Sequence, residues 1–312
     1  MKISNEVLEQ SLPWPALIDA IRKQFIAGCD VPVRHHHYME TTTASDATLL
    51  LMPAFESGEY VGLKIVNVFP DNNAISLPSI NADYLLYSGK TGELLAMLDG
   101  GILTARRTAA ASALAAKFLA KQDASTLFVV GSGRVASLIP EAMRTIRPIR
   151  DVKVWDLNKD NAQRLVDKLS ERGFNASVEL DLEVGTKGAD IISCATLSTT
   201  PLILGEWLKP GQHLDLIGSF TPSMRETDDT AMSTADVYID VETAFLESGD
   251  IIEPMKTGAL SKSDIKGDLA VLCKINGGRE SEKSITVFKA VGTALEDLAA
   301  AKLVYNMKSK LN

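Results

Sequence analysis

The chain has 312 residues, of which 46% are hydrophobic and 23% charged, the proportions of an ordinary globular protein with room for about two domains. Its formal net charge of −8 at pH 7 argues against nucleic-acid binding, which requires clustered lysines and arginines, although a few local arginines can still bind a small anion. Three widely separated cysteines without a CxxC pair argue against a disulfide framework, and with no signal-peptide pattern and no apolar run of roughly 18 residues we expect a cytoplasmic protein.

The first third of the chain predicts a helix followed by a sheet. After Pro15, apolar residues recur at helical spacing as far as Ile26. Strand-like runs follow, separated by short turns rich in glycine and polar residues. These runs cover residues 33–40, 47–52, 60–69, 83–87 and 94–98. Because the connections are short and contain no long helix, we expect an antiparallel or mixed sheet.

The rest of the chain alternates strands with helices. An alanine-rich helix is predicted over residues 102–120, and its small side chains permit close packing. From Thr126 onward, helical segments separate the apolar runs TLFVV, VKVWD, ADIISCA, HLDLIG and VYIDV, which is the pattern of a doubly wound parallel sheet. A last helical run, about Ile285 to Tyr305, is long enough to pack back on the first part of the chain.

A glycine-rich motif of the form G-x-G-x-x-A follows the first of these strands. The motif is Gly131-Ser132-Gly133-Arg134-Val135-Ala136. In a dinucleotide fingerprint the first glycine permits a tight turn, the second lets backbone N–H groups approach a pyrophosphate, and the small third residue lets a helix pack close to the strand. An apolar stripe up to Ile146 predicts that helix, with the phosphates at its N-terminus and a kink at Pro140. A glycine turn that binds no nucleotide is the alternative.

The second strand carries an acidic residue where a ribose-binding carboxylate is expected. Asp156 lies near the end of this strand, about twenty residues past the glycines. A carboxylate accepts hydrogen bonds from ribose hydroxyls and repels a 2′-phosphate, and Leu157 and Asn158 supply no adjacent cation. We therefore expect NAD(P)H as the cofactor, with NADH preferred over NADPH. Lys159 and Arg134 leave NADPH open, because either side chain can reach a phosphate.

Four segments together resemble the ornithine cyclodeaminase/mu-crystallin family and span most of the chain. They are MPAFESGEYVGLKIVNVFPDN, LTARRTAAASALAAKFLA, FVVGSGRVA and FKAVGTALEDLAAAKLVY. The family contains ornithine cyclodeaminases, alanine dehydrogenases, ketimine reductases and Δ1-pyrroline-2-carboxylate reductases. The resemblance implies a homodimer with an α/β fold. A Rossmann domain with a doubly wound parallel sheet (residues 121–289) would be inserted in a mixed α+β substrate-binding and dimerisation domain (residues 1–120 and 290–312).

Three basic residues match the family's substrate-binding positions. The resemblance assigns Arg34 and Arg107 to the substrate carboxylate, which a guanidinium group can hold with two hydrogen bonds. It assigns the role of active-site lysine to Lys64, which either adds a third positive charge or supplies a proton. Without the resemblance, the alternative is that Arg34 and Arg106 are surface residues and Lys64 is an exposed strand lysine, and for Lys64 that alternative is favoured. The further cofactor contacts expected are Asn158, Ala195, Thr196, Ile217, Gly218, Ser219 and Val291.

Three consecutive histidines do not predict a metal site. In a strand, adjacent side chains point to opposite faces, so that His35 and His37 converge but His36 does not. The remaining histidine, His213, belongs to the other predicted domain. We expect a structural or substrate-rim role for the three histidines and no bound metal.

The predicted function is NAD(P)H-dependent reduction of a cyclic imine carboxylate. Phe220 stands where the family's cyclodeaminases carry an aspartate, and it cannot accept a proton, which favours simple imine reduction. GSFTPSMRE also resembles the family's Δ1-pyrroline-2-carboxylate reductases. The expected substrates are Δ1-pyrroline-2-carboxylate and its six-membered piperideine analogue, which give L-proline and L-pipecolate. The rivals are an ornithine cyclodeaminase, an alanine dehydrogenase and a crystallin-like binding protein without turnover. No membrane partner is expected.

Overall fold

The computed structural model of the protein describes residues 1–42 and 45–309. The chain divides into two compact units, Met1–Thr108 with Thr293–Asn312, and Ala109–Gly292. The first boundary falls inside helix α3 (Gly100–Leu119), whose residues belong partly to each unit. No helix in the described part of the chain is long and apolar enough to cross a membrane.

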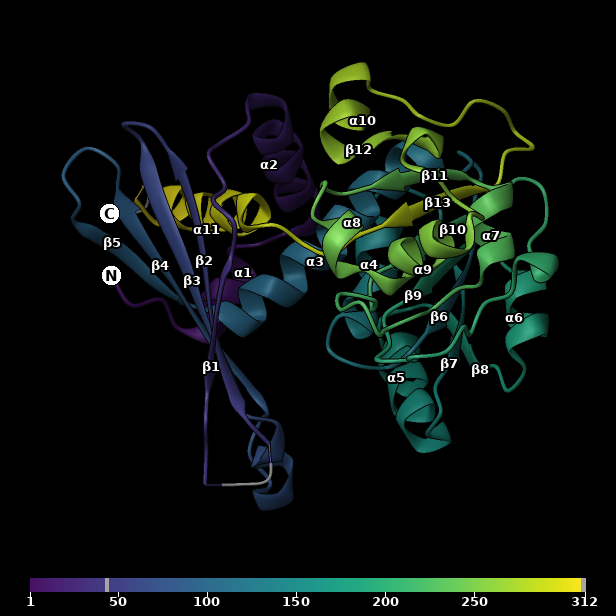
Figure 1. Cartoon of the computed structure of the whole chain (residues 1–312), viewed down its shortest axis with the longest axis horizontal. Coiled ribbons are helices and arrows are strands. Elements are labelled where there is room, and N and C mark those ends of the chain that lie inside the picture. The colour runs from purple at the N-terminus through teal and green to yellow at the C-terminus, as the bar shows by residue number, and fades with distance from the viewer. Residues whose placement is uncertain (43–44, 310–312) are drawn as a thin grey trace. The chain divides into compact units, whose positions relative to one another are not determined.

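The first unit is built on a five-stranded antiparallel sheet in which the strands follow chain order (Figure 1). The strands are β1 (His35–Met39), β2 (Ala47–Glu56), β3 (Tyr60–Val68), β4 (Ile80–Ser88) and β5 (Leu94–Asp99). The helices are α1 (Asn5–Gln10), α2 (Trp14–Ala27), η1 (Pro70–Ile75), the first part of α3, and α11 (Ala294–Ser309). Helix α11 comes from the end of the chain and packs against β2, β3, β4 and β5. One face of the sheet is therefore closed by the last helix.

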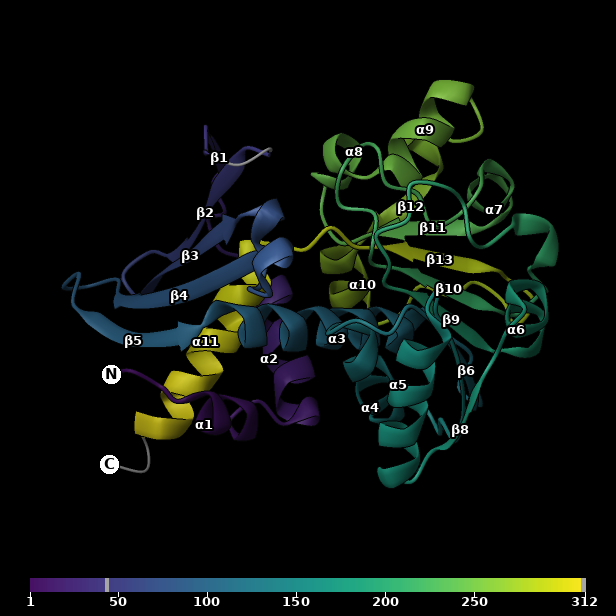
Figure 2. The same ribbon diagram turned by 90° about the horizontal axis from the view of Figure 1, so that it is seen from below.

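The second unit is an eight-stranded parallel sheet in the order β12-β11-β13-β10-β9-β6-β7-β8 (Figure 2). The strands are β6 (Thr126–Val130), β7 (Asp151–Trp155), β8 (Asn175–Val178), β9 (Ile191–Cys194), β10 (His213–Leu216), β11 (Asp236–Ile239), β12 (Ile265–Asp268) and β13 (Thr286–Lys289). From β8 through β6 to β10 the order is that of a doubly wound nucleotide-binding sheet, with its switch point between β6 and β9. The predicted Rossmann fold is confirmed.

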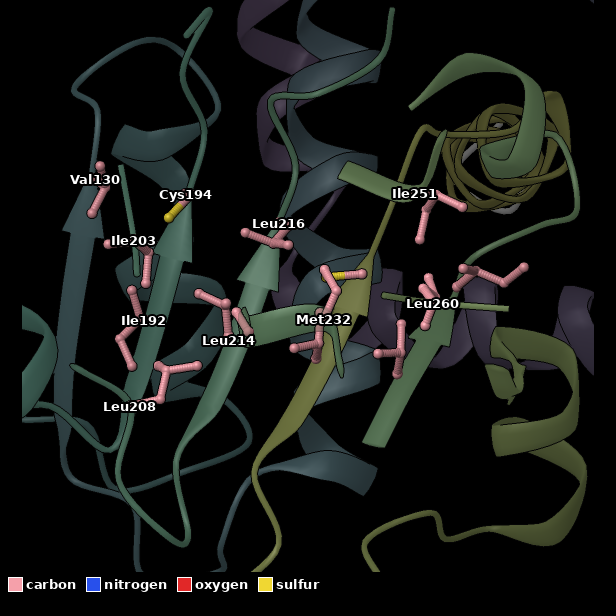
Figure 3. Packing of buried hydrophobic residues seen from close by; sticks show 14 of the residues in the cluster. Val130, Ile192, Cys194, Ile203, Leu208, Leu214, Leu216, Met232, Ile251 and Leu260 are labelled. Carbon is pink, nitrogen blue, oxygen red and sulfur yellow. The ribbon is translucent and has the colours of Figure 1, made fainter. Parts of the chain in front are cut away.

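Helices and short turns cover this parallel sheet. They are η2 (Ala136–Leu138), α4 (Ile139–Arg144), α5 (Lys159–Glu171), α6 (Leu182–Gly188), η3 (Gly205–Trp207), α7 (Asp229–Thr234), α8 (Ala244–Glu247), α9 (Gly249–Thr257), η4 (Lys262–Asp264) and α10 (Leu269–Ile275). Figure 3 shows part of the buried cluster in which strand residues such as Leu214 and Leu216 pack with Met232 of α7 and Ile251 of α9. This apolar packing holds the carboxyl ends of the strands in a fixed array.

Two predicted helices differ from those in the structure. Residues 286–289, expected to begin the last helix, form β13 in the middle of the sheet, and α11 starts only at Ala294. A short, fully buried apolar run has no periodicity that separates strand from helix. After the glycine motif, the expected helix is split into η2 and α4. Pro140 lies in the first turn of α4, where its missing N–H costs no helical hydrogen bond, so it helps to begin a helix and does not kink one.

Candidate active site

The glycine turn after β6 has the geometry that a dinucleotide requires. Gly131 has φ +104°, and a Cβ atom there would lie 2.7 Å from the carbonyl oxygen of Ala195, so both conformation and space demand glycine. Gly133 is exposed, and nothing lies within 4 Å of an added Cβ atom. Its backbone is therefore open to a close approach. The residues present thus fit the pyrophosphate of NAD(P).

Asp156 is held against this turn. It follows β7 directly, and its Oδ2 accepts a hydrogen bond of 2.6 Å from the Ser132 hydroxyl. Its Oδ1 accepts one of 2.8 Å from the backbone N–H of Asn158. The Asn158 side chain instead caps α5 by accepting from the N–H of Asp160. Each carboxylate oxygen of Asp156 keeps a further lone pair, which fits a ribose hydroxyl as donor.

A polar pocket of about 510 Å³ opens beside these residues. Its lining residues are Ser132, Gly133, Arg134, Ser137, Asp156, Asn161, Arg164, Leu165 and Lys168. Arg164 and Lys168 lie four residues apart on α5, so their side chains share one helix face. The sequence analysis did not predict Arg164 or Lys168 as pocket residues, although their spacing of four residues in a predicted helix was visible in the sequence.

The loops after β9, β10 and β13 contain the remaining predicted cofactor residues. The predicted cofactor residues of these loops are Ala195, Thr196, Ile217, Gly218, Ser219 and Val291. Because the three strands adjoin β6 or each other in the parallel sheet, their carboxyl ends lie at one edge. The Ser219 side chain is fully buried and donates to the carbonyl of Met224 at 2.6 Å, so only its backbone is available to a ligand. Phe220, next in the chain, is 45% exposed.

The first unit contains a buried cluster of charges around Lys64 of β3. The Lys64 Nζ lies 2.7 Å from Asp297 Oδ2 and 3.3 Å from the Thr104 hydroxyl. The Arg107 guanidinium of α3 donates from Nε to Asp297 Oδ1 at 3.0 Å and from Nη1 to Glu296 Oε2 at 2.6 Å. All four charged side chains are 6% exposed or less, so the two cations and two carboxylates neutralise each other out of water.

Burial and neighbouring charges set the protonation of this cluster. Burial lowers the pKa of Lys64 to about 8; Asp297 opposes this shift, whereas Arg107 and Arg34 add to it. Burial alone would raise the pKa of Asp297, but the charges of Lys64 and Arg107 outweigh it and hold that pKa below its usual value. Lys64 is therefore a buried amine whose pKa lies well below that of an ordinary lysine, which is a property of functional lysines.

Two of the three predicted substrate-binding residues, Lys64 and Arg107, lie together in this cluster. The third, Arg34, is half-buried just before β1. Sequence reasoning missed the two acids of the cluster, Glu296 and Asp297. The available signal was an acidic pair in an otherwise apolar, alanine-rich helix, LEDLAAA, where two carboxylates are costly unless paired. The assignment of Arg34 and Arg107 to a substrate carboxylate stays a prediction.

The three histidines lie on the exposed edge strand β1, with the His35 and His37 rings in an edge-to-face arrangement at 6.2 Å. Among the described residues, no group of three or more His, Cys, Asp and Glu side chains is arranged to hold a metal ion.

Comparison with known proteins identifies the family. The model of the ornithine cyclodeaminase/mu-crystallin family matches residues 1–311. The chain belongs to this family. An uncharacterised protein of Schizosaccharomyces pombe is 41% identical, with 99% of this chain and 97% of that protein covered. Family membership and the nucleotide fingerprint together make the chain an NAD(P)-dependent oxidoreductase of the ornithine cyclodeaminase/mu-crystallin family.

Two solved structures of family members superimpose on the whole chain. Thermococcus litoralis Δ1-pyrroline-2-carboxylate reductase, in complex with NADH and L-proline, is 31% identical with a TM-score of 0.93, and the match covers 100% of this chain and 98% of that one. An archaeal alanine dehydrogenase, a dimer with bound NAD, is 30% identical with a TM-score of 0.89, covering 100% and 97%. Two different activities thus occur at nearly the same identity, so overall similarity does not decide the substrate.

Proposed function

We propose that this chain reduces Δ1-pyrroline-2-carboxylate, and its six-membered piperideine analogue, to the corresponding cyclic L-amino acid with NADH. The observation that carries the proposal is the buried Lys64–Asp297–Arg107 cluster. It combines a titratable amine with a guanidinium group, which suits a substrate that has a basic nitrogen beside a carboxylate. The reductase that binds NADH and L-proline supports the same substrate class.

Separate groups of side chains serve the two halves of the proposed reaction. When bound, NADH would supply the hydride that the imine carbon accepts. Arg107, with Arg34, binds the carboxylate, and Arg107 is oriented for this by Asp297 and Glu296, which occupy its Nε and Nη1 groups. The Lys64 ammonium faces the imine nitrogen, stabilising or supplying the proton that the nitrogen carries in the amine product. In the second unit, Gly133 and Asp156 hold the pyrophosphate and ribose.

Phe220 distinguishes imine reduction from cyclodeamination. Cyclodeamination oxidises an amine, closes the ring, releases ammonia and returns the hydride, and those middle steps need a general base within hydrogen-bond reach. An aromatic ring at position 220 provides none, and it favours a flat ring over a flexible ammonium side chain, whose unpaired charge is costly to bury. Alanine dehydrogenase activity is the second candidate, because the archaeal dehydrogenase is as similar as the reductase.

A substrate comparison tests the proposal. Purified enzyme with NADH is expected to reduce Δ1-pyrroline-2-carboxylate at least tenfold more efficiently than pyruvate with ammonia. With NAD and ornithine it should release no ammonia and form no proline. Spectrophotometric NADH oxidation, with amino-acid analysis of products, measures all three. Faster turnover of pyruvate with ammonia would make the protein an alanine dehydrogenase, and proline from ornithine at a comparable rate would make it a cyclodeaminase.

Lys64 predicts a pH limit on the reaction. Because burial lowers its pKa to about 8, the ammonium loses its proton as pH rises through that value. The factor that the Lys64 ammonium contributes to kcat/KM should therefore be constant below about pH 8 and fall about tenfold per pH unit above it. Lys64→Met should lower kcat/KM by about 100- to 10,000-fold, the range for loss of a general acid.

The Lys64→Met variant also serves as the control for titration of the imine itself. Substrate ionisation affects both proteins, so only the difference between the two pH profiles reports on Lys64. Identical profiles, or a loss below about fivefold, would remove Lys64 from the proton-handling role.

Asp156 predicts the choice of nucleotide. Its fixed carboxylate accepts from ribose hydroxyls and repels a 2′-phosphate, so kcat/KM with NADH should exceed that with NADPH. Asp156→Asn should lower the ratio of kcat/KM with NADH to kcat/KM with NADPH, mainly by raising kcat/KM with NADPH. Asp151→Asn, the same change at an exposed residue outside the lining of this pocket, is the control and should leave the nucleotide preference unchanged. Wild-type efficiency that is equal or better with NADPH would mean that Arg134, Arg164 and Lys168 outweigh the carboxylate.

The sheet of the first unit supports a homodimer. On the face opposite the buried side chains, successive strands carry partly exposed apolar residues. These are Leu51, Pro53, Phe55, Val61, Leu63, Ile65, Leu85 and Met97. Two apolar sheet faces pack well together, and a two-fold dimer uses the same face of each copy. The archaeal alanine dehydrogenase is a dimer. We propose that a second copy covers this face.

Ile65, in the centre of this face, tests the dimer. Ile65→Glu should shift the sedimentation mass at micromolar concentration from two chains to one. Leu180→Glu, which places the same charge at a 62% exposed leucine in the other unit, should leave the mass unchanged. A wild-type monomer, or an unshifted Ile65→Glu dimer, would show that this face is not the interface.

A further inference from the structure

Glu226 is a fully buried acid that no step of the proposed reaction uses. Its Oε1 accepts hydrogen bonds from the backbone N–H and the hydroxyl of Thr196, at 2.7 and 2.9 Å. Its Oε2 accepts one of 2.6 Å from the backbone N–H of Gly218. Thr196 lies in the loop after β9 and Gly218 in the loop after β10. One carboxylate therefore links the loops that leave two adjacent strands.

The two loops meet so closely that no side chain fits between them. A Cβ atom on Gly218 would lie 2.2 Å from the Thr196 carbonyl oxygen and 2.3 Å from Glu226 Oε1. The close approach requires glycine at 218 and an acceptor at 226 for the N–H groups that it buries. The acid and the glycine are eight residues apart in one segment, Gly218 to Glu226.

Hydrogen bonds to the backbone at Glu226 also hold this residue in place. Asp250 of α9 accepts from the backbone N–H groups of Glu226 and Thr227 at 2.8 and 3.1 Å. The Lys289 ammonium, fully buried in β13, lies 3.7 Å from the other Asp250 oxygen and donates to the carbonyl of Leu216 at 3.1 Å. The carboxylate thus has little freedom to move. If its hydrogen bonds are lost, we expect the Thr196 and Gly218 loops to change position.

We propose that Glu226 is the positioning residue of the nicotinamide end of the cofactor site, holding the Thr196 and Gly218 loops together in the arrangement that binds the nicotinamide. The assignment of these loops to the cofactor rests on the proposed function. Glu226 touches neither cofactor nor substrate, and it acts only through the two loop backbones. Asp240 makes an analogous link, accepting from the N–H groups of Val291 and Gly292 at 2.8 and 2.6 Å in the loop after β13.

The link requires the ionised form of Glu226. Both of its oxygens face donors, and a protonated oxygen would direct an O–H group at an N–H or hydroxyl group. Burial raises the pKa of Glu226 to about 7; Lys289 opposes this, Asp250 adds to it, and the Thr196 hydrogen bonds oppose it. The Cys194 thiol of β9 also interacts electrostatically with Glu226. Because the folded pKa is raised, the link is complete above about pH 7 and lost as pH falls through that value.

Direct NADH binding tests the proposal without any substrate. Glu226→Gln puts an amide NH2 group against one of the donors and should weaken NADH binding, measured by fluorescence titration, by about tenfold or more. The wild-type affinity should fall as pH is lowered from 8 to 6, and the Glu226→Gln affinity should stay level. The protection factors of the Thr196 and Gly218 amides, which compare their hydrogen-exchange rates with the intrinsic rates at the same pH, should likewise fall at low pH in the wild-type apoprotein, a test that requires no variant to fold.

Asp215→Asn is the matched control. Asp215 is also fully buried, its pKa is raised to about 6 by burial, and its Oδ2 accepts from Ser193 in the sheet and not from Thr196 or Gly218. This variant should keep the wild-type NADH affinity and pH dependence. Equal weakening by the two variants, an unchanged affinity and pH profile in Glu226→Gln, or a wild type that binds no NADH would each overturn the proposal. If the NADH results hold but no imine is reduced, the substrate assignment fails and the role of Glu226 stands.

Discussion

The first unit depends on the pairing of Lys64 and Arg107 with Asp297 and Glu296. The two cations come from β3 and α3, and the two carboxylates come from α11, about two hundred residues later in the chain. Removing one member would leave a buried charge unpaired, at a cost of about 3–5 kcal/mol. The cluster therefore explains why the last helix belongs to the same unit as the first strands. It also explains how Lys64 and Arg107 remain fixed in a place from which water is largely excluded.

The second unit uses buried carboxylates for a different purpose. An apolar core sets the spacing of the parallel strands, and the loops beyond the strands contain buried N–H groups that need acceptors. Glu226 and Asp240 provide those acceptors. Asp156 fixes the opposite end of the site by joining the glycine turn to the second strand. Rigid support of this kind lets loop backbones bind a cofactor with little loss of conformational freedom.

The sequence predicted the fold well wherever the signal was local. Alternating strands and helices indicated the parallel sheet, and short turns between strands indicated the antiparallel one. It failed at β13, whose four buried residues have no distinguishing period, and at Pro140, where the turn chemistry was misjudged. The partners of Lys64 and the role of Glu226 depend on contacts between distant segments, and an isolated acid in a sequence does not reveal its acceptor or donor. Glu296 and Asp297 are different, because two acids in an apolar helix indicate in the sequence itself that they have partners.

The central claim is that hydride passes from the nicotinamide to the carbon of a cyclic C=N bond. The most direct measurement supplies NADH deuterated at both C4 positions to a mixture of Δ1-pyrroline-2-carboxylate, pyruvate and ammonia, and analyses the amino acids by mass spectrometry and NMR. The account predicts L-proline with a single deuterium at C2, in an amount equal to the NADH consumed. Deuterium recovered mainly in alanine, or NADH consumed without labelled proline, would contradict it.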